Sequence, residues 1–336
     1  MNKYNPLWGD KPYYSVNEYC KHRYHEKLYK IAIDAGFTCP NRDGTRGKRG
    51  CIFCSAGGSG DFAVKTFDKK DMMQVHAASY DTASVKSVTE QIQEGLSLFK
   101  VKQVGTRFIA YFQAYTNTYA PVEHLRNLYT QALSHPDIAG ISIATRPDCL
   151  PEECLDLLVD LQTQFPDKFI WVELGLQTMH EATATFIRRG YPLSVFEKAM
   201  DELTNRNIPV IVHVILGLPG ETPDMQYATI SYLNRLYPFG IKLQLLHILK
   251  GTDLADYYID SVDDFKALDK QEYLDLLIGC IERLSPDIVI HRVTGDGPKD
   301  LLIAPTWSLN KRDVLNSLHK QMREQNAFQG KLYQPN

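Results

Sequence analysis

The sequence predicts an α/β fold: a partial (β/α)6 barrel, related to a TIM barrel but incomplete, with N- and C-terminal extensions. Three observations predict it. Apolar runs of strand length alternate six times with stretches of helical periodicity, their connections are short, and no low-complexity linker divides the 336 residues. Such alternation favours a parallel sheet with right-handed crossovers. Six repeats are too few to close an eight-stranded barrel, so we expect an open one.

Each repeat is expected from an apolar run that is followed by a helical pattern. The expected strands are Leu28–Ala35, Arg107–Gln113, Gly140–Thr145, Phe169–Leu174, Pro209–Leu216 and Ile241–Ile248. The expected helices are Ser84–Phe99, Pro121–Leu133, Pro151–Gln164, Glu181–Arg206 with a break near Gly190–Pro192, Pro223–Leu236 and Asp264–Leu284. Ile288–Val293 is a candidate for a further strand. Residues 28–293 would then form the barrel, and residues 1–27 and 294–336 would be extensions packed on it.

The composition is that of a folded protein of the cytoplasm. Hydrophobic residues make up 44% and charged residues 23% of the chain, which excludes wholesale disorder. The apolar run Ile208–Leu218 is too short to span a membrane, and the N-terminus lacks the apolar stretch of a signal peptide. Seven cysteines in such a chain do not indicate a disulfide framework. Four of them lie in helical or apolar contexts and are expected to be buried: Cys20, Cys149, Cys154 and Cys280.

Charge is spread unevenly along the chain. The net charge is −3, yet residues 1–50 hold ten Lys/Arg against five Asp/Glu, and residues 299–336 hold six against three. Basic ends around an acidic middle suit an anionic partner such as a nucleic acid. Solvated surface charge explains the same pattern equally well.

The other three cysteines share one loop. The segment CPNRDGTRGKRGCIFC places Cys39, Cys51 and Cys54 in a Cys-x11-Cys-x2-Cys pattern after the first expected strand. Thiolates gathered in this way select iron–sulfur clusters, zinc or copper. Three ligands would leave one iron of a [4Fe–4S] cluster open to a cosubstrate. Alternatively, Cys51 and Cys54 form half of a zinc site, which His22, His25 or Cys20 would complete.

The cysteine loop after the first strand of a partial barrel resembles the radical SAM (S-adenosylmethionine) superfamily, whose usual spacing is Cys-x3-Cys-x2-Cys. The longer first gap is similar to the radical SAM domain of the Elongator catalytic subunit and, more closely, to the bacterial YhcC/YtqA-like family. That likeness runs nearly end to end, through NPLWGDKPYYSVNEYCK, YFQAYTNTYAP, ATRPDCL, WVELGLQT, HVILGLPGET and HRVTGDGPKDLLIAPTW. It implies a [4Fe–4S] cluster on the three cysteines and SAM bound at its open iron.

The resemblance also implies residues that contact SAM. Gln113, Ala114 and Tyr115 stand where the superfamily carries a Gly-Gly-Glu-like motif, whose backbone holds the methionine amine. Glu173 and Gln177 match a segment that meets the SAM ribose or carboxylate. The alternative for Gln113–Tyr115 is an aromatic strand edge without a ligand. The alternative for Glu173 and Gln177 is a buried structural pair.

Further candidates line the expected barrel mouth. Gly217 and Pro219 let the backbone approach a flat ring such as adenine, although a plain turn would use the same residues. Arg146 suits a carboxylate or a phosphate. His213 would point into the barrel if Val212 and Val214 point outward, and Lys250 and His247 lie at the end of the sixth strand.

The substrate implied by the resemblance is the wobble uridine of tRNA. Its 5-carboxymethylaminomethyl group would be converted to 5-aminomethyl through a 5′-deoxyadenosyl radical, and Arg146, Lys250 or Arg292 would hold the substrate carboxylate. An electron donor such as flavodoxin or ferredoxin would act as a partner. Two alternatives stay open: a radical SAM enzyme for a small metabolite or peptide, and a zinc-stabilised RNA-binding protein.

Overall fold

The computed structural model describes residues 4–58, 86–101, 105–261, 264–295 and 297–335. The chain forms two compact units. The cysteine unit comprises Leu28–Gly175 and Ser194–Val210, and the terminal unit comprises Met1–Lys27, Leu176–Leu193 and Ile211–Asn336. Gly60 of the cysteine loop and the expected helix start at Ser84 lie outside the described residues.

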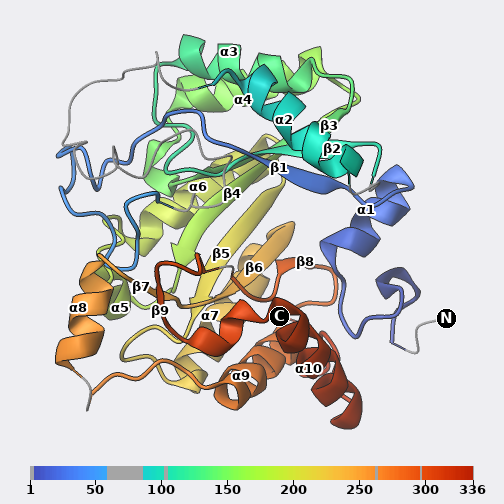
Figure 1. Ribbon diagram of the computed structural model, residues 1–336. Helices are drawn as coiled ribbons and strands as arrows, with labels where there is room; N and C mark the ends of the chain where they lie inside the picture. The colour runs from blue at the N-terminus through green and yellow to red at the C-terminus, as the bar shows by residue number, and fades with distance from the viewer. Residues whose placement is uncertain (1–3, 59–85, 102–104, 262–263, 296, 336) are drawn as a thin grey trace. The chain divides into compact units, whose positions relative to one another are not determined.

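The cysteine unit is a parallel sheet with helices packed on it. Figure 1 shows its helices α2, α3 and α4 side by side along strands β1 to β3. Its strands are β1 (Tyr29–Ile33), β2 (Phe108–Phe112), β3 (Ile138–Thr145) and β4 (Phe169–Gln177), paired in that order. Its helices are α2 (Val88–Val101), α3 (Val122–Leu133), η4 (Pro147–Cys149), α4 (Glu152–Gln164) and α6 (Leu193–Asn205).

Burial explains why these segments fold as they do. Every residue of β2 and β3 is buried, as expected of a parallel sheet covered on both faces. Helix α3 buries Leu125, Tyr129, Ala132 and Leu133, which repeat at helical spacing and form one apolar stripe.

The sheet of the cysteine unit is strongly curved. Lys30 on β1 lies 2.8 Å from the carboxylate of Glu173 on β4, although two strands separate β1 from β4. Three strand spacings of a flat sheet would hold the two backbones about 14 Å apart. The ion pair therefore lies on a concave face, as in the wall of a barrel.

The terminal unit continues the β/α alternation and holds both chain ends. Its parallel strands are β5 (Val210–Leu216), β6 (Gly240–Leu245) and β8 (Val289–Arg292), and β7 (Ile248–Leu249) pairs with β9 (Leu302–Ala304) in the antiparallel sense. The strand order is β1-β2-β3-β4 in the cysteine unit and β5-β6-β8 in the terminal unit, which confirms the predicted α/β class and the candidate strand at 288–293. The helices are η1 (Pro6–Trp8), α1 (Val16–Tyr24), α5 (Glu181–Phe186), α7 (Pro223–Leu236), α8 (Asp253–Asp260), α9 (Lys270–Arg283), η5 (Thr306–Leu309) and α10 (Lys311–Glu324).

The two ends of the chain are joined within the terminal unit. The buried side chain of Gln329 accepts a hydrogen bond from the Tyr14 amide (2.8 Å) and donates to the carbonyls of Ser285 (2.6 Å) and Ile288 (2.8 Å). Tyr4 stacks on Phe328 with ring centroids 4.5 Å apart. Both extensions thus contact each other and the loop before β8.

Two predicted elements have boundaries that are wrong for a clear physical reason, and one helix was not predicted. The strand expected over 241–248 ends at Leu245, and Ile248–Leu249 pairs instead with β9. The helix expected from Asp264 begins at Lys270, because Asp269 and Glu272 form a capping box there. Helix α8 falls where no helix was expected, and Thr252 caps it.

The predicted break in 181–206 is confirmed, since α5 ends at Phe186 and α6 begins at Leu193. No helix among the described residues has the length and apolar character needed to cross a membrane.

Candidate functional site

The cysteine loop follows β1 and is folded by its own backbone. The amides of Arg42 and Asp43 donate to the Cys39 carbonyl (2.7 and 3.1 Å). The Gly50 amide donates to the Asn41 carbonyl (2.8 Å), and the Cys54 amide donates to the Cys51 carbonyl (3.0 Å). These bonds bring the far end of the long first gap back to its beginning, so an eleven-residue spacer still leaves the cysteines on one compact loop.

The three thiols interact electrostatically. Burial, followed by the charges of Cys54 and Cys39, raises the pKa of the Cys51 thiol to about 12. A cationic metal centre would remove this penalty by binding all three sulfurs as thiolates. The thiolates of a cubane cluster bind separate irons, and three free thiols on one compact loop are the donor set that a [4Fe–4S] cluster with one open iron requires.

Two residues beside Cys39 contact the other two cysteines. The Asn41 side-chain amide donates to the Cys51 sulfur (3.6 Å), and the Arg42 guanidinium donates to the Cys54 carbonyl (2.8 Å). Sequence reasoning assigned neither residue a role at the cysteines. The available signal was the order Cys-Pro-Asn-Arg, which places two strong donors next to a ligand.

The segment Gln113–Tyr115 runs alongside the cysteine loop, where its predicted role would require it to be. Ala114 is buried, and Tyr115 has a positive φ of 59°. The Tyr115 hydroxyl donates to the Ala56 carbonyl, and its ring faces Gly58, where an added Cβ would come within 2.9 Å of it. The backbone after β2 is thus held against the loop that carries the cysteines.

Arg146 is buried and held by an acidic partner. Its Nε and Nη2 donate to the two oxygens of Asp148, each at 2.9 Å. The Nε of Arg46, from the cysteine loop, lies 2.9 Å from the same carboxylate. The cluster of two arginines and one aspartate carries a net positive charge.

A cavity of about 760 Å³ lies in the cysteine unit beside this cluster. It is bounded by Asp43 and Arg46 of the cysteine loop, Tyr119 after β2, Asp148 after β3 and Lys198 of α6. The cavity therefore opens at the loops that follow the parallel strands, which is where barrel enzymes place their sites.

The carboxylate of Glu173 is shielded from solvent and already bonded within the protein. Its side chain is fully buried, and one oxygen accepts hydrogen bonds from Lys30 (2.8 Å) and from the Ser142 hydroxyl (2.6 Å). The Lys30 ammonium also lies 4.2 Å from the centre of the Tyr111 ring. The structure thus brings Glu173 together with one residue from each of β1, β2 and β3.

Gln177 ends the same strand and belongs to the terminal unit. Its φ is 66°, and among the described residues its buried Oε1 has no hydrogen-bond partner. An unsatisfied buried acceptor is costly, so it fits a donor supplied by a ligand.

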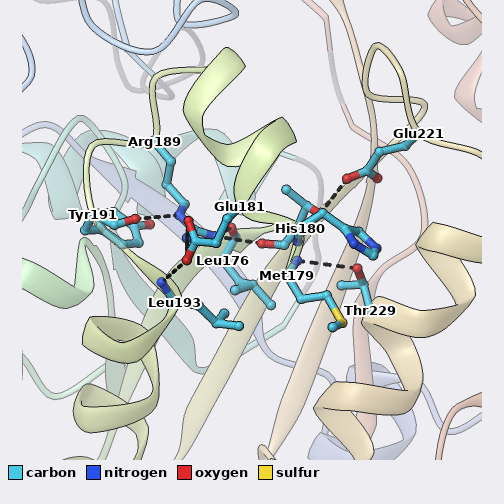
Figure 2. A network of polar contacts seen from close by, with 10 residues as sticks. Leu176, Met179, His180, Glu181, Arg189, Tyr191, Leu193, Glu221 and Thr229 are labelled. Carbon is cyan, nitrogen blue, oxygen red and sulfur yellow. Dashed lines mark hydrogen bonds and ion pairs between the residues drawn. The ribbon is translucent and has the colours of Figure 1, made fainter.

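A buried arginine fixes the backbone on either side of Gln177. Figure 2 shows Arg189, which is 1% exposed, reaching the segment between β4 and α6. It donates to the carbonyls of Leu176 (3.2 Å), Thr178 (2.7 Å) and Tyr191 (3.0 Å). Sequence reasoning missed Arg189, because an arginine in a loop gives no sign that it is buried.

The turn after β5 joins this network. The Thr178 hydroxyl donates to Glu221, and burial raises the pKa of that carboxyl group. Gly217 has a φ of 86°, and a Cβ there would come within 2.9 Å of Leu268. Pro219 beside it is buried. The backbone conformation of the Gly-Leu-Pro-Gly turn therefore requires glycine at position 217, because a side chain there would be strained and would collide with Leu268.

The remaining candidates lie in the terminal unit. His213 is half-buried between the buried Val212 and Val214, and the strand register places it opposite Lys242, which in turn lies opposite Arg292. Three basic residues thus sit on adjacent strands. Lys242 is 2% exposed and was missed by sequence reasoning.

His247 and Lys250, expected at the end of the sixth strand, both contact the C-terminal segment. Lys250 donates to the Asp300 carbonyl (3.1 Å), and His247 lies 3.0 Å from the Ser308 hydroxyl.

Comparisons with known proteins agree with this architecture. The Radical SAM superfamily matches residues 42–233, and the Radical_SAM C-terminal domain matches residues 238–324. YtqA of Bacillus subtilis (strain 168) is 40% identical over 326 residues, which cover 97% of this chain and 94% of that protein. The tRNA uridine(34) acetyltransferase of Dehalococcoides mccartyi (strain CBDB1) is 25% identical over 190 residues, 55% of this chain and 40% of that protein.

Among solved structures, the archaeal Methanocaldococcus infernus Elp3 with an N-terminal deletion has a TM-score of 0.62 at 16% identity. The match covers 72% of this chain and 60% of that one, and it confirms the partial-barrel fold. The family matches decide between the cluster and zinc alternatives: the chain belongs to the radical SAM superfamily, whose cofactors are a [4Fe–4S] cluster and SAM.

Proposed function

We propose that this radical SAM enzyme acts on the wobble uridine of tRNA and converts 5-carboxymethylaminomethyl-uridine to 5-aminomethyl-uridine. The observation that carries the proposal is the basic cysteine loop, in which Arg46, Lys48 and Arg49 are exposed within the segment that joins two cluster ligands. A polyanion attracted to these side chains arrives beside the cluster. The likeness to a relative named for tRNA uridine(34) supports the same substrate.

In this proposal Cys39, Cys51 and Cys54 hold three irons of the cluster. The backbone of Gln113–Tyr115 holds the SAM amine, and the orphaned Gln177 Oε1 accepts a hydrogen bond from SAM. The backbone of the turn at Gly217 and Pro219 lies against the adenine ring, and Arg146 supplies a positive charge for a carboxylate or a phosphate. When bound, the cofactors supply a 5′-deoxyadenosyl radical, while the protein positions the substrate and excludes water.

The substrate side chain carries a glycine-like CH2 between an amine and a carboxylate. Loss of a hydrogen atom there gives a radical that both neighbours stabilise. Loss of a second electron to a one-electron acceptor and of the N–H proton to a base gives an imine. Water then adds across the C=N bond, and the adduct breaks to glyoxylate and the aminomethyl group. His213, Lys242 and Arg292 are the basic residues we assign to the carboxylate, with Lys250 as a further candidate.

The deciding measurement is mass spectrometry of tRNA nucleosides from a strain that lacks this gene. We expect 5-carboxymethylaminomethyl-uridine to accumulate and 5-aminomethyl-uridine to disappear. In vitro, tRNA together with an electron donor such as flavodoxin or ferredoxin should raise the yield of 5′-deoxyadenosine. If a small metabolite or a peptide raises that yield and tRNA does not, the wobble-uridine substrate is wrong.

A further inference from the structure

We propose that Asn41 and Arg42 are positioning residues of the iron–sulfur cluster, which hold Cys51 and Cys54 in place and raise the reduction potential of the cluster. The inference rests on the proposed assignment of the cluster to Cys39, Cys51 and Cys54. It adds two residues that touch the ligands.

Arg42 is fixed over the Cys51–Cys54 turn. Its Nη2 donates to the carbonyls of Cys54 (2.8 Å) and Ser55. The Tyr115 ring lies 5.6 Å from the guanidinium carbon on another side. A Cβ on Gly50, whose φ is +75°, would come within 2.9 Å of the Arg42 Nε. Glycine at position 50 therefore leaves the space that the Arg42 side chain occupies.

Asn41 performs the matching task at Cys51. Its residue is 5% exposed, and its side-chain N–H points to the Cys51 sulfur at 3.6 Å, which is within hydrogen-bond range for sulfur. The backbone carbonyl of Asn41 accepts a hydrogen bond from the Gly50 amide (2.8 Å), and this bond fixes the backbone from which the Asn41 side chain extends. The adjacent residues Asn41 and Arg42 thus contact two different cysteines, Cys51 and Cys54.

These contacts favour the reduced cluster. Reduction adds negative charge that is shared with the sulfur ligands, so an N–H donor and a cation beside those sulfurs stabilise the reduced state more than the oxidised one. Asn41 is that donor at Cys51, and Arg42 is the cation that the loop places against the Cys51–Cys54 turn.

The test is a redox titration of the reconstituted cluster without SAM, followed by electron paramagnetic resonance. Arg42→Gln should lower the midpoint potential by about 59 mV or more, which is a tenfold change in a one-electron equilibrium. Asn41→Ala should lower it less, because a neutral donor is lost. Arg42→Lys keeps the charge without the planar fork and should lie between the wild-type protein and Arg42→Gln.

Lys48→Gln is the matched control, since it removes one positive charge from an exposed position on the same loop. Equal shifts for Lys48→Gln and Arg42→Gln, or wild-type potentials in both Arg42→Gln and Asn41→Ala, would overturn the proposal. If Arg42→Gln binds no iron while Arg42→Lys binds it, the positioning role is supported, and the potentials of Arg42→Lys and Asn41→Ala test the tuning role. A wild-type protein that binds no cluster would instead overturn the ligand assignment itself.

Discussion

At the residue scale, the seven cysteines separate by environment. Cys20, Cys149, Cys154 and Cys280 are buried as predicted, whereas Cys39, Cys51 and Cys54 are partly exposed. Burial raises the pKa of the Cys149, Cys154 and Cys280 thiols to about 12. Since the thiolate is the nucleophile, these three thiols should react slowly at neutral pH.

The first prediction follows from this separation. In apoprotein treated with iodoacetamide at neutral pH, Cys39 and Cys54 should be alkylated before the four buried cysteines. The folded-state pKa values of Cys149, Cys154 and Cys280 are raised, so their alkylation should be slow at neutral pH and should increase steadily as the pH rises toward about 12. Mass spectrometry of peptides measures the order. A loaded cluster should protect Cys39, Cys51 and Cys54, and equal labelling with and without iron would contradict the ligand assignment.

The second prediction concerns the two roles considered for Glu173. Glu173→Gln removes the charge that pairs with Lys30, at a cost of roughly 1.5–3 kcal/mol in the free energy of unfolding. Denaturant unfolding measures this loss, and Ser142→Ala is the control that removes one hydrogen-bond donor to Glu173 and leaves the ion pair with Lys30 in place. Unchanged SAM affinity in the folded variant would assign Glu173 to structure, whereas a tenfold or larger loss would assign it to SAM.

Single residues differ in how far the sequence predicts them. The cysteines are predictable because their spacing on one short loop is itself the signal. The partner of Glu173 is not, because Lys30 lies 143 positions away and meets it only when the sheet curves. The same holds for Lys242, whose position beside His213 depends on strand register.

At the element scale, local signals predict types and some boundaries. Helix α7 has its expected bounds of Pro223–Leu236 because Thr222 caps it and Pro223 begins it. The start of α9 was also predictable, since Asp269-x-x-Glu272 is a capping-box sequence. The end of β6 was not, because Ile248–Leu249 pairs with a strand more than fifty residues later along the chain.

The third prediction concerns the segment between β4 and α6, which Arg189 organises. Arg189→Met removes the donors to three carbonyls, and each buried acceptor left unsatisfied costs roughly 1–3 kcal/mol. We expect a lower melting temperature and, in protein that still folds, weaker SAM binding because Gln177 is no longer held. Glu181→Gln is the milder control, since Glu181 is half exposed and 3.4 Å from the guanidinium. Full SAM affinity in Arg189→Met would contradict the positioning of Gln177.

At the scale of the whole molecule, charge placement is the feature that local stability does not explain. Lys311 and Arg312 are exposed in the first turn of α10, where the helix dipole disfavours cations. Lys270 lies 2.5 Å from Asp313, so the acidic residue of this turn is paired with a cation. Phosphate binding is the role that our proposal gives to Lys311 and Arg312.

The fourth prediction tests that role. Changing Lys311 and Arg312 to Glu should leave α10 at least as stable, since anions suit a helix N-terminus. The change should weaken tRNA binding and reduce its salt dependence, by a slope of up to about 0.9 for each phosphate that the variant no longer binds. The measurement is tRNA affinity at several salt concentrations, with slow SAM cleavage in the absence of substrate as the check that the cluster site is intact. Lys266→Glu is a control at an exposed cation that pairs with Glu272. Equal tRNA affinity and salt slope in the Lys311/Arg312 variant and the wild-type protein would show that tRNA does not contact this helix, even if the cysteine loop still binds it.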